Sequence, residues 1–443
     1  MLGCSTGWRM NINGTANGLD FARAVTLTGK QDVVAAGFTE NTRSGFGFTV
    51  VKVSAEQGTE LWRRVINGSA NTSGIVNQAT AVTIVDAGDV IAVGAIANAE
   101  SSDDAIVVKF DGATATELWR QVINGASNGS DVARSVVLDS SKNVITAGYT
   151  SNLRGFADLS VIKFDGANGT ELWRQIIIGS ENGASEAAEI AVDARGDLVV
   201  VGFTWSPKMA GDFAVAKLDG VTGTVLWSKA ISGTSPVSFD LAHAVTGDLA
   251  GDVIAAGYLR NSLTEDDFTV IKLDGTSGAE RWRTTINGTS NGIDRALAIA
   301  VDVNGHVVAA GHIRNTETLD DFFVTKLDGI TGSELWRQTI NGDANGDDWA
   351  GTVSLDVLGN VVAAGATENR LTGTDFTVVR FDGASGRELW RKVINGTANN
   401  VDAAFAITTD ASGNVIAVGR SQNTGTGDDF IVVKLTASNG RDF

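Results

Sequence analysis

Residue types that commonly carry out catalysis are scarce in this sequence. Its 443 residues include three histidines and one cysteine, Cys4. His306 stands where other repeats carry asparagine, His312 follows a strand glycine, and His243 lies near the start of an expected strand. The sequence shows no Ser-His-Asp order, metal-ligand spacing or phosphate loop. We therefore predict a protein that is not an enzyme, with no catalytic residue, no metal ligand set and no cofactor.

Aspartates recur at two places where strands are expected to begin. The first strands open with Asp20, Asp131, Asp240, Asp294, Asp348 and Asp402, and the third strands with Asp104, Asp158, Asp212, Asp267, Asp321, Asp375 and Asp429. In strands that alternate in direction, both sets fall at one end of the sheets. One interpretation is turn chemistry, because aspartate accepts backbone N–H bonds at turns. The other is an acidic face that attracts cations or basic partners. The segment DANGDD at 343–348 has oxygen ligands of the kind that calcium binds.

The elements that position these residues are internal repeats. Tryptophan recurs every 54 to 57 residues, at Trp8, Trp62, Trp119, Trp173, Trp227, Trp282, Trp336 and Trp390. Each repeat has four short runs rich in Val, Ile, Phe and Thr that are broken by Gly, Asn and Asp, which indicates strands and turns. Four-stranded units repeated eight times predict an all-β, eight-bladed β-propeller in one domain.

The expected blades cover 20–66, 77–123, 131–177, 185–231, 240–286, 294–340, 348–394 and 402–435. The last blade lacks a fourth strand, and residues 7–12 have the sequence of one. We therefore expect this N-terminal segment to complete the C-terminal blade as its outer strand.

Two expectations concern side-chain positions within a blade. Strict alternation places Ala296, Ala298 and Ala300 on one face of a first strand, with Leu297, Ile299 and Val301 on the other. A turn centred on Ile330 sets Lys326 opposite Glu334 and Val324 opposite Trp336. The repeated tryptophan is expected to hold adjacent blades together, because its burial outweighs an exposed ion pair.

The fourth unit departs from the others. Its segments TWSPKMAGD (204–212) and SGTSPVSFD (232–240) hold both prolines, an extra tryptophan and a methionine, and Ser228 replaces the usual arginine. Loops that break a repeat on a rigid scaffold are suited to binding. Their candidate partner-binding residues are Trp205, Pro207, Met209, Pro236, Phe239 and His243. The alternative is that these residues fill a local gap.

The phrase D-G-x-T-G-x-E-L-W resembles the tryptophan-docking motif of the quinoprotein dehydrogenases, which are eight-bladed propellers, and the eight tryptophans match it. The portion SGNVIAVG…DDFIVVKL is similar to SBBP-type repeats of bacterial surface and secreted proteins. The first resemblance implies a pyrroloquinoline quinone site with a vicinal cysteine pair and Ca²⁺. One cysteine cannot form that pair. A related non-catalytic group that uses such propellers as scaffolds implies a binding function instead.

Net charge is −18, which disfavours nucleic acid and anionic membrane surfaces as partners. No apolar run is long enough for a membrane span, and no signal peptide is present in this chain. We expect a monomeric, extracytoplasmic bacterial scaffold module for a protein or peptide partner. The alternatives are a quinone-dependent dehydrogenase and a calcium-dependent adhesion module.

Overall fold

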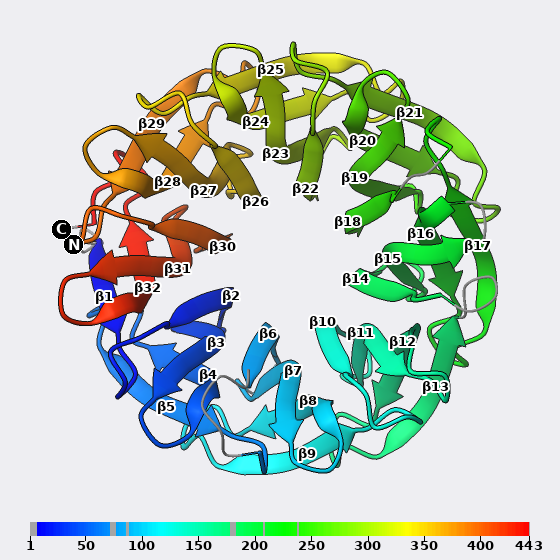
Figure 1. The fold of residues 1–443 in the computed structure, drawn as a ribbon, viewed down its shortest axis with the longest axis vertical. Helices are drawn as coiled ribbons and strands as arrows, with labels where there is room; N and C mark the ends of the chain where they lie inside the picture. The colour runs from blue at the N-terminus through cyan, green and yellow to red at the C-terminus, as the bar shows by residue number, and fades with distance from the viewer. Residues whose placement is uncertain are drawn as a thin grey trace. The chain divides into compact units, whose positions relative to one another are not determined.

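The computed structural model describes residues 7–70, 77–85, 88–177, 183–206, 209–236 and 239–442, and every regular element in these ranges is a strand. The strands form eight four-stranded sheets in which sequence neighbours pair, so the fold is an eight-bladed β-propeller (Figure 1). The chain divides into two compact units, residues 1–99, 108–118 and 341–443, and residues 100–107 and 119–340.

The first unit holds three complete blades. Their strands are β2 (Phe21–Leu27), β3 (Val33–Asn41), β4 (Gly45–Val53) and β5 (Glu60–Ile66); β26 (Trp349–Leu355), β27 (Val361–Asn369), β28 (Gly373–Phe381) and β29 (Glu388–Ile394); and β30 (Ala403–Thr409), β31 (Val415–Asn423), β32 (Gly427–Leu435) and β1 (Trp8–Ile12). One further sheet has residues in both units: β6 (Gln78–Ile84), β7 (Val90–Asn98), β8 (Ser102–Phe110) and β9 (Glu117–Ile123).

The second unit holds four complete blades. Their strands are β10 (Val132–Leu138), β11 (Val144–Ser151), β12 (Ala157–Phe164) and β13 (Glu171–Ile177); β14 (Glu186–Val192), β15 (Leu198–Ser206), β16 (Met209–Leu218) and β17 (Val225–Ile231); β18 (Leu241–Gly247), β19 (Val253–Asn261), β20 (Glu265–Leu273) and β21 (Glu280–Ile286); and β22 (Arg295–Val301), β23 (Val307–Asn315), β24 (Leu319–Leu327) and β25 (Glu334–Ile340).

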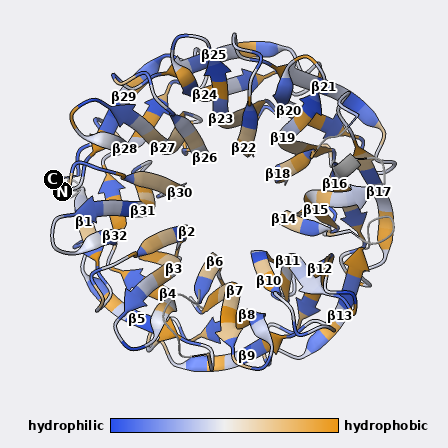
Figure 2. Cartoon of the chain, in the orientation of Figure 1, coloured by the Kyte–Doolittle hydropathy of each residue, from blue (hydrophilic) through white to orange (hydrophobic). Residues whose placement is uncertain are grey.

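Burial follows the position of a strand within its blade. The second and third strands are apolar and almost wholly buried, as in β19 and β20. The fourth strand alternates buried with exposed residues, and Figure 2 shows hydrophilic residues interrupting these outer strands. Both faces of the middle strands are therefore covered by neighbouring sheets, which explains why these strands lack polar alternation.

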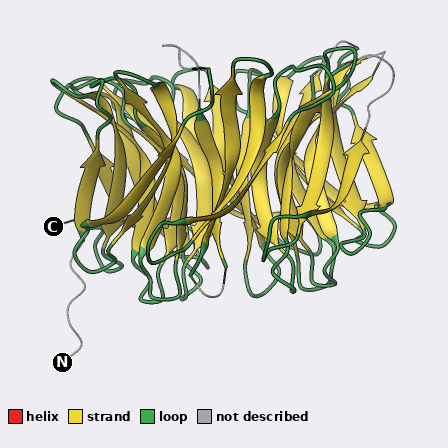
Figure 3. Cartoon of the chain, turned by 90° about the horizontal axis from the view of Figure 1, so that it is seen from below, coloured by secondary structure: helices red, strands yellow, loops and turns green. Residues whose placement is uncertain are grey.

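Tight turns join the strands, and Figure 3 shows them as loops at the strand ends. Glycine is required in the turn between the third and fourth strands. Gly278 has a φ of +67° and Gly332 a φ of +72°, a region that side chains disfavour. A Cβ atom on Gly332 would also lie 2.7 Å from the indole of Trp282 in the preceding blade. Because this glycine has no side chain, the tryptophan of the preceding blade can pack directly against the turn.

A β-bulge changes the predicted faces of the first strand. The register of β22 against β23 shifts between Ala296 and Ala298, which leaves Leu297 as the extra residue. After the bulge the parity reverses, so Ala296 packs in the same cluster as Ile299 and Val301. The prediction that the three alanines of this strand share one face was wrong.

A second bulge changes the predicted hairpin register. Lys326 pairs with Trp336, and the register then shifts so that Leu327 pairs with Glu334. Lys326 does not face Glu334 but forms an ion pair with Asp302 of the turn between β22 and β23, with an Nζ to Oδ2 distance of 2.8 Å. The expected cross-strand ion pair was therefore wrong by one position.

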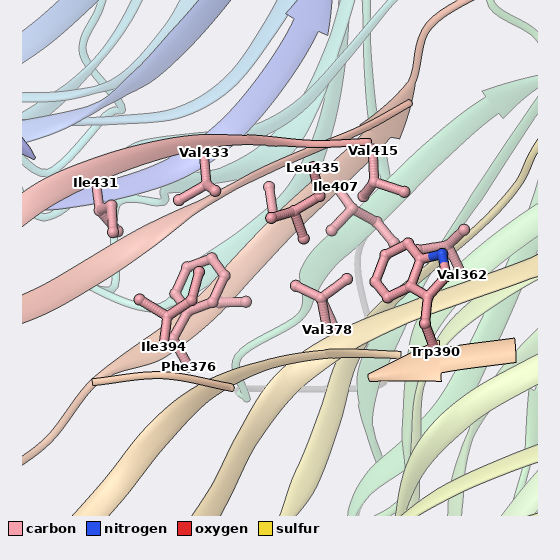
Figure 4. Close-up of a cluster of buried hydrophobic side chains, with 13 residues drawn as sticks. Val362, Phe376, Val378, Trp390, Ile394, Ile407, Val415, Ile431, Val433 and Leu435 are labelled. Atoms are coloured by element: carbon pink, nitrogen blue, oxygen red, sulfur yellow. The ribbon is translucent and has the colours of Figure 1, made fainter. Parts of the chain in front are cut away.

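The core lies between adjacent blades. In the first unit Trp390 packs beside Val362, Ile407 and Val415, which come from two consecutive sheets (Figure 4). Its indole Nε1 donates a hydrogen bond to the Ala437 carbonyl at 3.1 Å. One side chain thus supplies both apolar burial and a directed bond between blades.

Strand β1 completes the C-terminal blade, as predicted. It pairs antiparallel with β32 from Trp8 opposite Lys434 to Ile12 opposite Phe430, which makes it the edge strand of this sheet (Figure 1). The indole of Trp8 donates to the carbonyl of Ala55 in the sheet β2–β5. Residues from opposite ends of the sequence therefore hold this blade together.

Candidate functional site

The two irregular loops of the fourth sequence repeat, whose blade is β14–β17, lie side by side. The backbone N–H of Asp240 donates to the Gly211 carbonyl at 2.8 Å, and Ser232 Oγ donates to Asp212 Oδ1 at 2.6 Å. These bonds place Ser232 and Asp240 beside the start of β16. The two loops therefore form one surface, as their expected strand directions required.

Phe239 anchors this contact. Its ring lies 4.7 Å from that of Phe203, measured between centroids, and a Cβ atom on Gly211 would be 2.9 Å from it. More than a third of Phe239 remains exposed. The aromatic pair fixes the loop while leaving one ring edge open to a partner.

Trp205 lies over a different wall of the same blade. A Cβ atom on Gly183 would come within 1.8 Å of its indole, so the ring covers that glycine. Trp205 also lines a hollow of about 310 Å³ together with Ile177, Val200 and Ala214. An apolar hollow of this size is suited to one large apolar side chain.

The hollow lies where an ion pair of the other outer strands is missing. Elsewhere an arginine bonds the glutamate three residues before it, as Arg337 does to Glu334 at 2.8 Å and Arg283 to Glu280 at 2.6 Å. Val225 and Ser228 occupy these two positions in β17, and Ser228 lines the hollow. The loss of the arginine at Ser228 was identified from the sequence, whereas the loss of the glutamate at Val225 was not.

The other candidate residues of these loops contribute less. Pro236 is exposed, Pro207 lies outside the described residues, and Met209 begins β16 but its side chain is not among those described. The structure therefore brings Phe239 to Phe203 and Trp205 to the hollow.

His243 belongs to a separate cluster on β18. Its ring centroid lies 5.7 Å from that of Tyr258, on which the guanidinium of Arg295 stacks at 4.4 Å. Arg295 in turn bonds Asp266 at 2.6 Å. Burial, with a smaller effect of the Arg295 charge, lowers the pKa of His243 to about 4. This histidine is neutral at physiological pH and packs as a core residue.

The aspartates that open the first strands are buried and bond the backbone. Asp294 accepts hydrogen bonds from the N–H groups of Gly288 and Arg314, and Asp20 from those of Gly14 and Glu40. Burial raises the pKa of Asp294 to about 7 and that of Asp20 to about 6, against the effect of these bonds. These contacts are the turn chemistry that was one interpretation of this set.

The segment 343–348 has the same construction. Asp343 accepts a bond from the N–H of Arg370 at 2.7 Å, and Asp348 from that of Gly342 at 2.7 Å. The carboxylates of Asp343 and Asp348 thus accept hydrogen bonds from backbone N–H groups. In the described part of the chain, no three His, Cys, Asp or Glu side chains are grouped to hold a metal ion.

The repeated tryptophans contact the turn of the next blade. Trp62 Nε1 donates to the Gly112 carbonyl at 3.1 Å, and Trp282 to that of Gly329 at 3.3 Å. The same donor bond is made by Trp8, Trp119, Trp227 and Trp390. Trp173 covers Gly223 of the following turn, while Trp336 is 8% exposed.

The family relationship rests on a match that extends over more than half of the chain. A family model described as outer membrane protein assembly factor BamB matches residues 47–259 and, in an overlapping second match, residues 157–426. The chain belongs to this family. The BamB family match agrees with the PQQ-like propeller resemblance of the sequence, while the resemblance to SBBP-type repeats stays a prediction. No curated protein sequence matches the chain.

Solved structures share the fold with this BamB family member. BamB from Moraxella catarrhalis is 14% identical with a TM-score of 0.51, covering 94% of this chain and 99% of that one. The quinohemoprotein alcohol dehydrogenase from Comamonas testosteroni is 12% identical, with a TM-score of 0.58 and coverages of 97% and 76%. The enzyme ADHIIG from Pseudomonas putida HK5 is 11% identical, with a TM-score of 0.61 and coverages of 98% and 76%. In the described residues no helix could cross a membrane.

Proposed function

We propose that this protein is a non-enzymatic scaffold that binds a protein partner outside the bacterial cytoplasm. The family description, which names an outer membrane assembly factor, supports both the class of partner and the compartment. The binding surface that we propose is the hollow beside Trp205 together with the loop that carries Phe239.

The observation that carries this proposal is the local loss of the outer-strand ion pair. Val225 and Ser228 replace the glutamate and arginine of the other repeats, and an apolar hollow of about 310 Å³ lies there. Trp205 lines this hollow and Phe239 is partly exposed on the adjoining loop. Aromatic residues of this kind are enriched at the centre of protein interfaces. A partner side chain that enters the hollow would displace water from Trp205.

The test restores the repeat in the fourth unit. A photocrosslinking amino acid at Phe239, expressed in the source bacterium, should trap a defined partner in the wild-type background. The double variant Val225→Glu with Ser228→Arg rebuilds the ion pair and fills the hollow, so the crosslink should fall at least about tenfold. Equal crosslinking by the filled variant would contradict the proposal.

A matched control makes the reverse change in another blade. Glu334→Val with Arg337→Ser removes the ion pair of β25 without touching the fourth unit. This variant should keep the crosslink at the wild-type level. A loss of the crosslink in both variants would indicate an effect on folding instead of on the surface.

A quinone-dependent dehydrogenase is the second candidate, favoured by the two alcohol dehydrogenases that share the fold. The residues do not fit the quinone site of the resembled enzymes, because the chain has one cysteine and most repeated tryptophans bond neighbouring turns. Incubation with pyrroloquinoline quinone and Ca²⁺, followed by a dye-reduction assay with alcohols, tests this function. Dye reduction would overturn the non-enzymatic proposal.

A further inference from the structure

Four blades share a buried aspartate with one carboxylate oxygen that has no hydrogen-bond partner. Asp267, Asp321, Asp375 and Asp429 open the third strands of their blades and are at most 4% exposed. In each, one oxygen is bonded by an asparagine and a threonine, as Asn261 and Thr264 bond Asp267 Oδ2 at 2.7 Å. The other oxygen, Oδ1, is buried and unpartnered in all four.

An asparagine of the same blade presents a second unpartnered oxygen. Asn287, Asn395 and Asn13 follow the outer strands, and Oδ1 of each is buried without a partner. Their Nδ2 groups are already used, because each donates to the asparagine four residues later at 2.6 Å. Each of these blades therefore buries two oxygens that can only accept.

Strand register places the two oxygens in the same location. Phe268 pairs with Ile286, so the next position sets Asp267 beside Asn287, and the pairs Phe376 with Ile394 and Phe430 with Ile12 do the same in two further blades. In the remaining one of the four blades Phe322 pairs with Ile340 and sets Asp321 beside Asn341, whose Oδ1 is also buried without a partner and whose Nδ2 donates to Asn345 at 2.7 Å. In β4 the aspartate position is Gly47. A Cβ atom there would lie 3.1 Å from Asn67 Oδ1, the equivalent asparagine oxygen. The asparagine oxygen thus points at the aspartate side chain.

In the fourth sequence repeat a hydrogen-bond donor stands where these four blades have the asparagine oxygen. There Ser232 takes the place of the asparagine, and its hydroxyl donates to Asp212 Oδ1 at 2.6 Å. Asp212 Oδ1 is accordingly satisfied. One repeat has thus replaced the facing acceptor by a donor, which indicates that the other repeats need a donor or a positive charge from outside the chain.

The charge at these positions favours a cation over a neutral donor. The buried aspartate of the turn after the first strand has a lysine partner, as Asp302 has Lys326 at 2.8 Å. Among the described residues Asp267, Asp321, Asp375 and Asp429 have no ion-pair partner. A buried carboxylate without a counter-charge is costly, whereas a bound ion provides that charge.

We propose that the Asp267–Asn287, Asp321–Asn341, Asp375–Asn395 and Asp429–Asn13 pairs are each a binding site for a calcium ion. Carboxylate and amide oxygens are ligands of hard cations, and calcium completes its shell with backbone carbonyls and water. One carboxylate per site predicts weak affinity, with Kd on the order of 0.1–1 mM. The proposal is independent of the partner surface in the fourth unit.

The experiment measures bound calcium on protein stripped with EDTA, by equilibrium dialysis against ⁴⁵Ca²⁺. The quadruple variant Asp267→Asn, Asp321→Asn, Asp375→Asn, Asp429→Asn removes the charge and supplies an N–H donor, so it should bind four fewer ions per chain. In the wild type, CaCl₂ above Kd should raise Tm by about 2–4 °C. The quadruple variant should lose that shift.

Two further variants test the location of the sites. Asp212→Asn, in the blade with Ser232, is the matched control and should leave the number of bound ions unchanged. Asn287→Ser with Asn341→Ser, Asn395→Ser and Asn13→Ser copies Ser232 and should remove the same four ions, even if the aspartate variant does not fold. A wild type that binds no calcium would overturn the proposal, as would unchanged binding in the serine variant. If the wild type binds no calcium and the aspartate-to-asparagine variant is more stable, the unpartnered oxygens are instead bonded by water, by a proton or by an asparagine amide in the reversed orientation.

Discussion

Lys217 Nζ lies 2.6 Å from Asp193 Oδ2, and both side chains are at most 2% exposed. The same ammonium group donates to the Gly275 carbonyl of the next blade at 2.8 Å. One lysine therefore joins the turn of its own blade to a turn of the neighbour. The pattern recurs where Lys163 bonds Gly220 and Lys272 bonds Gly329.

Removal of this lysine should destabilise the protein strongly. Lys217→Ala leaves the buried Asp193 carboxylate without its counter-charge, which typically costs about 3–5 kcal/mol. Urea unfolding followed by tryptophan fluorescence measures the change in the free energy of unfolding. Arg337→Ala, which removes an exposed partner of Glu334, is the control and should cost at most about 1 kcal/mol. Equal losses in the two variants would contradict this role of burial.

A repeated tryptophan should contribute more to stability than an exposed leucine of the next outer strand. Trp282 is 8% exposed and covers Gly332, whereas Leu335 is 48% exposed on the next outer strand. Trp282→Ala should cost about 3–5 kcal/mol, because it opens a cavity and removes the bond to Gly329. Leu335→Ala should cost less than about 1 kcal/mol. Differential scanning calorimetry would show a large Tm decrease in the first variant alone.

Glu189 should make the protein less stable as pH rises. Its carboxylate accepts the Val245 N–H at 2.7 Å, and burial raises its pKa to about 7 from an ordinary 4.5. Between those values the folded chain holds a proton that the unfolded chain has released. The stabilisation from this proton is complete below about pH 4.5 and is lost as pH rises through about 7.

The variant Glu189→Gln isolates this effect, because glutamine keeps an acceptor for Val245 and cannot ionise. Relative to the wild type it should gain up to about 3 kcal/mol of stability between pH 5 and pH 8. Urea unfolding at both values measures the gain. Glu56→Gln, on an exposed turn, controls for the lost charge. A wild type and Glu189→Gln variant with parallel pH profiles would refute the prediction.

Deletion of residues 1–12 should expose the edge of β32. Strand β1 pairs with β32 over five residues, and Ile12 is 1% exposed in this sheet. An unpaired strand edge promotes association between chains. Light scattering after size-exclusion chromatography should show oligomers, and differential scanning calorimetry should show a lower Tm. A monodisperse deletion variant with unchanged melting would contradict the role of β1.

The repeat could be predicted because its signals are local and periodic. Tryptophan spacing, turn glycines and apolar runs indicated eight four-stranded blades and the outer role of residues 7–12. The bulges at Leu297 and Leu335 could not be predicted, because an extra residue in one strand has no separate residue-type signal. Each bulge reverses parity, which is why Lys326 was assigned to Glu334 instead of Asp302.

The candidate site was predicted only in part for a similar reason. Trp205, Phe239 and Ser228 stood out because they break a repeated pattern. The loss of the glutamate at Val225 is visible in the sequence, but the hollow beside Ser228 and the contact of Trp205 with Gly183 are known only from three-dimensional packing. His243 has a common functional residue type, but its neutral, buried setting depends on Tyr258 and Arg295 of other strands.

The packing of Trp282 against Gly332 has a consequence for how the repeats evolve. The same match recurs where Gly278 receives Trp227 and Gly440 receives Trp390. Because each repeat carries one half of this joint at either end, any two repeats fit together without new complementary surfaces. Unequal recombination between repeats can therefore add or remove a whole blade in one genetic event. Natural variation in blade number should accordingly come in whole repeats, while the fourth repeat, with its own loops, is the one whose exchange would not be neutral.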